Sequence, residues 1–155
     1  MQSPEQRAKE LFDSGWYCAE SVLKAIAERL DINSEFIPGM ATGFCGGMSR
    51  CNGPCGALTG GVMAIGMVHG RRSEKDDQRC YIFSSKLIQR FVNEFGSMNC
   101  TEIIGKNLGI PAQRQEALDG KIIAGKCPGV TGTAARLTWE ILEEAREMIE
   151  SGKLD

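Results

Sequence analysis

The sequence predicts an all-α protein, a single compact bundle of about five or six helices that occupies residues 1–155. Apolar residues recur at helical spacing in several segments, strand-like alternation is nearly absent, and cap and turn residues separate the segments. Hydrophobic residues make up 42% and charged residues 25% of the 155 residues, which is typical of one globular domain.

The first two helices are marked by cap residues and by apolar spacing. Ser3 stands before Pro4 and three residues before Gln6, a pattern that begins a helix, and Gly15 is expected to end it. A second helix is expected over residues 17–30 because its apolar residues fall on one face. These residues are Val22, Leu23, Ile26 and Leu30.

The middle of the chain is rich in glycine and cysteine and then becomes strongly periodic. A connector over residues 34–40 leads into a glycine-cysteine loop over 44–53, and a helix of small residues is expected over 54–68. From Ser73 the spacing predicts a long helix that Gly96 ends. Its expected apolar stripe consists of Tyr81, Leu87, Ile88, Phe91, Val92 and Phe95.

Four further segments complete the expected bundle. Residues 99–105 form a short capped turn, and residues 111–118 form a small helix. Residues 121–130 are expected to be a loop or an extended segment because they contain Pro128. The last helix is expected over residues 133–151. Its inward-facing residues are Leu137, Ile141, Leu142, Ala145 and Ile149.

The overall charge gives no reason to expect a nucleic-acid partner. The net charge is −2 and basic pairs are isolated in the sequence, so no basic patch is predicted. The N-terminal segment lacks the basic region and apolar run of a signal peptide, and the longest apolar stretch, residues 57–68, is too short to span a bilayer. We therefore expect a cytoplasmic protein without a membrane partner.

Seven cysteines are the main chemical signal of the chain. In a reducing cytoplasm they are not expected to form a permanent disulfide framework, and their odd number favours the same view. The absence of a C-x-x-C pair argues against a zinc ribbon, a thioredoxin motif and covalently attached haem. Metal, cluster or thiol chemistry without haem is therefore the leading expectation.

Three of the cysteines stand at expected helix starts, namely Cys18, Cys55 and Cys100. Free backbone N–H groups and the positive end of the helix dipole stabilise a thiolate, or a metal-bound sulfur, at such positions. Cys127 precedes Pro128 in an expected loop, from which its side chain can turn inward. These four cysteines are therefore favoured for chemistry.

The remaining cysteines and the single histidine have less specific surroundings. Cys80 is expected to be a packing residue in the body of its helix. Cys45 and Cys51 lie in the glycine-rich loop, and they are either auxiliary thiols of a site or ordinary loop residues. His69 ends a helix, where it suits the helix dipole better than it suits a zinc site without other histidines.

Small residues form one smooth face of the helix expected over residues 54–68. Gly56 and Gly60 are four positions apart, with Ala57, Gly61 and Ala64 beside them. Such a face lets another backbone approach closely. Three uses are open: packing inside the chain, a homodimer contact through this glycine-rich helix, or the close surroundings of a cofactor.

Four parts of the sequence together resemble the redox-active C_GCAxxG_C_C protein family. They are GWYCAESVL (residues 15–23), CGALTG (55–60), FGSMNCTEIIG (95–105) and the late Cys127. The hallmark of this family is a CGAxxG motif with three further cysteines. The resemblance implies that the family cysteines are Cys18, Cys55, Cys100 and Cys127. The chain is also similar to the iron–sulfur portion of split-Soret cytochromes, although it has no C-x-x-C-H to carry a haem.

We therefore expect a redox protein in which Cys18, Cys55, Cys100 and Cys127 are ligands of a [2Fe–2S] cluster for electron transfer to an unknown redox partner. Two alternatives stay open. In a metal-free thiol–disulfide protein, Cys55 would attack and Cys18, Cys100 or a loop cysteine would resolve, which would make any enzyme activity that of an oxidoreductase. In a structural module, the four thiolates would hold zinc or another metal without turnover.

Overall fold

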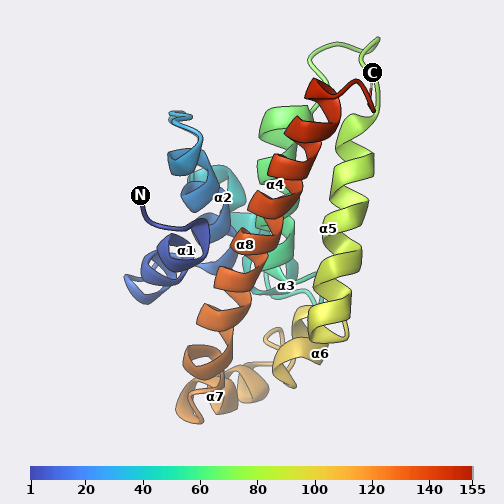
Figure 1. The fold of residues 1–155 in the computed structure, drawn as a ribbon. Helices are drawn as coiled ribbons and strands as arrows, with labels where there is room; N and C mark the ends of the chain where they lie inside the picture. Colours follow the sequence, from blue (N-terminus) through green and yellow to red (C-terminus); the bar gives the residue numbers. More distant parts are fainter. Residues whose placement is uncertain (155) are drawn as a thin grey trace.

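A computed structural model describes residues 1–154 as a bundle of eight α-helices and one 3-10 helix, with no strand in that range (Figure 1). The elements are α1 (Pro4–Asp13), α2 (Cys18–Arg29), η1 (Gly39–Phe44), α3 (Cys45–Met48), α4 (Gly56–His69), α5 (Arg79–Phe95), α6 (Cys100–Ile104), α7 (Pro111–Asp119) and α8 (Ile122–Glu150). The all-α prediction is confirmed. The helices outnumber the expected five or six because short helices form in segments that were expected to be loops or turns. None of the helices in residues 1–154 is long and apolar enough to cross a membrane.

Helix α8 packs against most of the other helices of the bundle. It runs along the molecule and contacts α1, α2, α4 and α5, and its N-terminal part contacts α6 and α7 (Figure 1). The largest fully buried apolar side chains come from α2, α4, α5 and α8, and they are Leu23, Ile26, Leu58, Ile65, Phe83, Leu87, Phe91 and Ile141. Because the long helices form the core, the short elements η1, α3 and α6 are available to form a site at one end of the bundle.

The smooth face of α4 is used for packing inside the chain. A Cβ atom on Gly60 would lie 2.6 Å from the backbone oxygen of Ala19, and one on Gly61 would lie 2.4 Å from Oγ1 of Thr138. Only glycine lets α4 approach α2 and α8 this closely. A homodimer through this helix stays a prediction.

The start of α5 was predicted six residues too early. Residues 73–78 form a turn in which the Asp76 carboxylate accepts hydrogen bonds from the backbone N–H groups of Arg72 (2.5 Å) and Ser73 (3.1 Å). This local bonding competes with a helix, so α5 begins only at Arg79. Cys80 therefore stands in its first turn rather than in its body. Tyr81 is 70% exposed and does not belong to the apolar stripe.

The predicted loop over residues 121–130 was wrong. These residues belong to α8 from Ile122 onward, and Pro128 lies inside the helix. A proline in a helix interior removes one hydrogen bond and costs about 3 kcal/mol. Tertiary packing outweighs this cost, since Val130 and Thr131 in the next turn are buried. Cys127 consequently projects from a helix and not from a loop.

Candidate functional site: a cysteine-lined cavity

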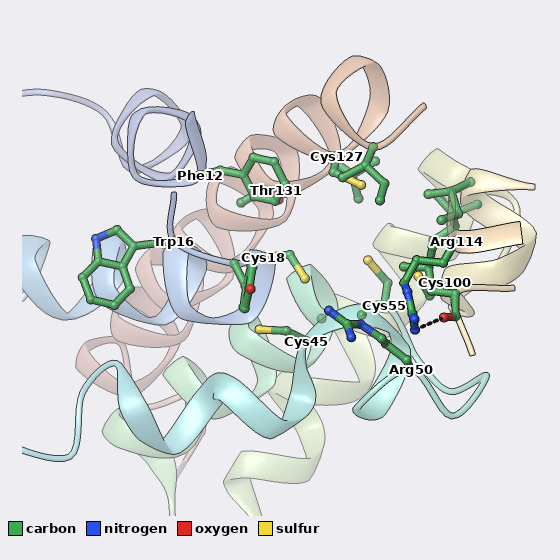
Figure 2. Close-up of a pocket in the computed structure, with 18 of the residues that line it drawn as sticks. Phe12, Trp16, Cys18, Cys45, Arg50, Cys55, Cys100, Arg114, Cys127 and Thr131 are labelled. Carbon is green, nitrogen blue, oxygen red and sulfur yellow. Dashed lines mark hydrogen bonds between the residues drawn. The ribbon is translucent and has the colours of Figure 1, made fainter. Parts of the chain in front are cut away.

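A cavity of about 550 Å³ lies where the first turns of α2, α6 and α8 meet the segment from η1 to α4 (Figure 2). Its lining contains five cysteines, which are Cys18, Cys45, Cys55, Cys100 and Cys127. All four cysteines favoured by the sequence therefore lie on one cavity, together with one whose role the sequence left open. Cys51 is exposed, and Cys80 packs beside Ser84 away from this lining.

Cys18 is held in place by the start of α2. The buried carboxylate of Glu20 accepts a hydrogen bond from the backbone N–H of Tyr17 (2.8 Å) and another from the hydroxyl of Thr42 (2.5 Å). The first bond caps the helix, and the second ties α2 to η1. Cys18 therefore has a defined position at the first residue of a capped helix.

Cys45 reaches the cavity because the chain reverses directly after it. Gly46 and Gly47 have φ values of 68° and 76°, which glycine adopts without strain. A Cβ atom on Gly56 would lie 2.4 Å from Sγ of Cys18 and 3.0 Å from Cα of Cys45, so glycine is required where these residues meet. Cys45 is thus a neighbour of Cys18.

Cys55 and Cys100 are brought together by backbone bonding. The N–H of Cys55 donates to the carbonyl of Met98 (2.7 Å), and the N–H of Cys100 donates to the carbonyl of Gly53 (3.1 Å). Pro54 and Asn99 form an isolated antiparallel bridge between the two segments. This arrangement makes Cys55 the N-cap of α4, one residue before the first turn in which it was expected.

Cys127 occupies the second turn of α8. Ile123 and Thr131 lie four residues before and after it on the same helix face, and both also line the cavity. The unexpected N-terminal extension of α8 is therefore what carries Cys127 to the site.

The five thiols differ strongly in acidity. A hydrogen bond from the Cys45 thiol lowers the pKa of Cys18 to about 7, against the opposing effect of burial. This effect competes with the hydrogen bond that the Cys45 thiol donates to the Ala41 carbonyl oxygen, at 3.5 Å. Among the cavity thiols, Cys18 is the one whose pKa is lowered.

In three of the other cysteines, burial is the largest influence on the pKa. Together with the charge of Cys18, it raises the pKa of Cys100 to about 11, that of Cys127 to about 12 and that of Cys55 further still. The backbone N–H groups at the start of α4 do not compensate for this desolvation at Cys55. The pKa of Cys55 is therefore raised while that of Cys18 is lowered, and the role of Cys55 as the attacking thiol stays a prediction.

The five cysteines line the cavity and are not grouped around a single position. No three His, Cys, Asp or Glu side chains within residues 1–154 are grouped as they would be around one metal ion. A tetrahedral zinc site would need four ligands at about 2.3 Å from the ion. An iron–sulfur cluster contains several metal ions bridged by its own sulfides, so its cysteines stand around a larger group. Cysteine thiolates are donors for both kinds of site.

Comparison with known proteins identifies the family. The chain matches the family model described as "Putative redox-active protein (C_GCAxxG_C_C)" over residues 16–141. The chain belongs to the C_GCAxxG_C_C family. All five cavity cysteines of this C_GCAxxG_C_C protein lie within the matched residues.

One relative of this C_GCAxxG_C_C protein is a protein of Archaeoglobus fulgidus that is described as uncharacterized. It is 28% identical over 152 residues, which cover 92% of this chain and 95% of that protein. No solved structure matches the chain.

Sequence reasoning left the role of Cys45 open and overlooked two arginines of the cavity, Arg50 and Arg114. The adjacent glycines after Cys45 were the available signal, because a pair of left-handed residues turns the chain back on itself. His69, in contrast, does not line the cavity, and its ring packs on Phe83 with the centroids 4.7 Å apart.

Proposed function

We propose that this C_GCAxxG_C_C protein is an electron-transfer protein that holds a [2Fe–2S] cluster on Cys18, Cys55, Cys100 and Cys127. The observation that carries the proposal is that these four cysteines, from four separate elements, line one cavity. Four thiolates are the usual ligand set of such a cluster. A cluster bound there would accept and release one electron.

The surrounding backbone suits negatively charged sulfur. The backbone N–H groups of Ala19 and Gly46 act to lower the pKa of Cys18, and those of Ala57 and Leu58 act to lower the pKa of Cys55. N–H groups close to a ligand sulfur stabilise the more negative state of a site and so raise its reduction potential. Burial of Cys55 and Cys100 limits the access of water and oxidants to these sulfurs.

Chemical analysis of anaerobically purified protein tests the proposal. We expect brown protein with visible absorption, and equal amounts of iron and acid-labile sulfide. Colourless protein with one zinc ion per chain would contradict the cluster. Metal-free protein that keeps its thiols after mild oxidation would contradict any redox role of the cavity.

A second candidate function is thiol–disulfide exchange between Cys18 and Cys45, favoured by the packing of both residues against Gly56 and by the lowered pKa of Cys18. The Cys18 thiolate would attack the disulfide of a small thiol compound and release one thiolate from it. Cys45 would then pass its proton to the released thiolate and attack the mixed disulfide, releasing the second thiolate, which takes a proton from water. The protein would end with a Cys18–Cys45 disulfide, and the compound would end as two thiols.

Peptide mapping of metal-free protein after oxidation by glutathione disulfide distinguishes this candidate. A Cys18–Cys45 disulfide that dithiothreitol reverses is the expected product. The matched control is Cys51→Ser, which removes the exposed cysteine and should leave the disulfide yield unchanged. Glutathione attached at Cys18 without a subsequent disulfide would exclude Cys45 as the resolving residue.

A further inference from the structure

We propose that the cavity also binds a small organic anion with an apolar body, whose carboxylate or phosphate group is held by Arg50 and Arg114. This inference names the substrate class of the site described above, and as a statement about substrate it rests on the proposed redox function. It starts from the size, the walls and the charge of the cavity.

The cavity is larger than a cluster requires. If each of the four atoms of a [2Fe–2S] core takes about 30 Å³, the share of one water molecule in the liquid, the core fills about 120 Å³. The cavity has about 550 Å³, so most of its volume stays free for another occupant. The volume remaining is comparable to the lower end of small-molecule sites.

The walls of this space suit an apolar body. They are formed largely by aromatic and aliphatic side chains, among them Phe12, Trp16, Ile104, Leu108, Ile123 and Val130. An apolar ligand that enters such a lining leaves water and gains free energy in proportion to the area it buries.

Apart from the cysteines of the site, the charged side chains of the lining are all cationic. Arg50 and Arg114 line the cavity, whereas no Asp or Glu does. Neither arginine forms an ion pair with another residue in the range 1–154. The chain as a whole has a net charge of −2, so this cationic lining does not simply reflect the composition. Guanidinium groups bind carboxylates and phosphates through two parallel hydrogen bonds.

The two arginines reach the cavity beside one loop. Arg114 donates from Nη1 to the carbonyl of Leu108 (3.2 Å), as the dashed line in Figure 2 shows. A Cβ atom on Gly109 would lie 2.3 Å from the backbone oxygen of Arg50, so the turn that carries Arg50 packs on the same loop. The carboxylate of Glu116 on α7 is paired with Lys106. Both guanidinium groups therefore keep donors free for a ligand.

An alternative role for these arginines is to balance the charge of the thiolates alone. In that case their removal would change the cysteine chemistry, but the cavity would not distinguish an organic anion from a neutral molecule. Ligands that differ in charge and in apolar size separate the two roles.

Isothermal titration calorimetry on anaerobically purified protein provides the test, with iron and sulfide determined on the same sample. We expect binding of benzoate or phenyl phosphate, the two together distinguishing a carboxylate from a phosphate site. Benzamide, which lacks the charge, and acetate, which lacks the apolar body, should each bind at least about tenfold more weakly. Equal binding of benzamide, or no binding of either aromatic anion, would overturn the inference.

Substitution of the arginines locates the site. Arg50→Gln and Arg114→Gln should each weaken the binding of the anion about tenfold or more, whereas Arg71→Gln should not change it. Arg71 is a matched control because it is exposed and outside the cavity lining. Arg114→Lys keeps the charge if the glutamine variant does not fold, and it should retain part of the affinity. Unchanged affinity in the folded arginine variants would overturn the inference.

The same samples separate the inference from the proposed function. Anion binding that depends on the arginines in protein without iron supports the binding site while contradicting the cluster. Iron and sulfide in protein that binds neither anion support the cluster while overturning the binding site.

Discussion

Cys55 and Cys100 are held beside each other by two backbone hydrogen bonds, one from the N–H of each cysteine to a carbonyl in the other segment. These bonds belong to the chain itself and need no metal. A Cβ atom on Gly47 would lie 2.7 Å from Cβ of Cys100, so the glycine turn after Cys45 is packed against this pair. Two members of the expected ligand set are therefore positioned by the backbone of the chain itself.

This arrangement predicts which cysteines the cofactor needs. Cys55→Ser and Cys100→Ser should each lose most of the iron and sulfide, because a serine oxygen is a poorer ligand for a cluster than a thiolate. Iron and sulfide analysis of anaerobically purified variants checks this. Cys80→Ser is the control, since Cys80 is outside the cavity, and its cluster content should equal that of the unchanged protein. Equal losses at all three positions would contradict the ligand assignment.

The close contacts around Gly56 predict that a larger residue at this position destabilises the protein. Gly56→Ala places a Cβ atom 2.4 Å from Sγ of Cys18 and should lower the free energy of unfolding by about 1–3 kcal/mol. Gly66→Ala in the same helix is the control, because nothing lies within 4 Å of its Cβ position. It should raise the free energy of unfolding by up to about 1 kcal/mol. Urea denaturation of reduced, metal-free protein measures both changes, and equal effects would show that the two glycines are not distinguished by packing.

The hydrogen bond from Cys45 predicts a pH dependence. The rate at which iodoacetamide alkylates Cys18 in metal-free protein should rise with pH around a midpoint of about 7, the pKa of Cys18. Cys45→Ala removes the donor that stabilises the thiolate, so the midpoint should move to higher pH. Cys45→Ser keeps a hydroxyl donor and should restore part of the shift. Mass spectrometry of the alkylated peptide reports each rate, and an unchanged midpoint in Cys45→Ala would contradict the bond.

The sequence predicted the elements whose signals are local. Ser3 caps α1 by accepting a hydrogen bond from the N–H of Gln6 (3.2 Å), and Gly96 ends α5 in the left-handed conformation, as expected. The small-residue face of α4 was also recognised, although its partners were not. Ser3 and Gly96 each act on their own helix, and the small residues of α4 act through their size. Both properties can be read from the residue types and their positions in the sequence.

Features decided by tertiary contacts could not be read in this way. Pro128 is a local signal against a helix, and only packing shows that α8 continues through it. Cys45 and Arg50 lie in a turn whose direction depends on several left-handed residues together. Cys45 and Arg50 line the cavity because that turn packs against Gly109 and Cys100. Spacing along the chain carries no information about such contacts.

The variant Pro128→Ala tests how much the proline inside α8 lowers the free energy of unfolding. Pro128→Ala restores a backbone N–H and removes the clash of the ring with the preceding turn, so we expect the free energy of unfolding to rise by about 1–3 kcal/mol. Cys127 should keep its place on the helix, and the cluster content should not fall. Gly125→Ala is the control in the same segment: with open space around its Cβ position, it should give a gain of up to about 1 kcal/mol from helix propensity alone. Urea denaturation and iron analysis of both variants check this, and a loss of iron in Pro128→Ala would show that the proline positions Cys127.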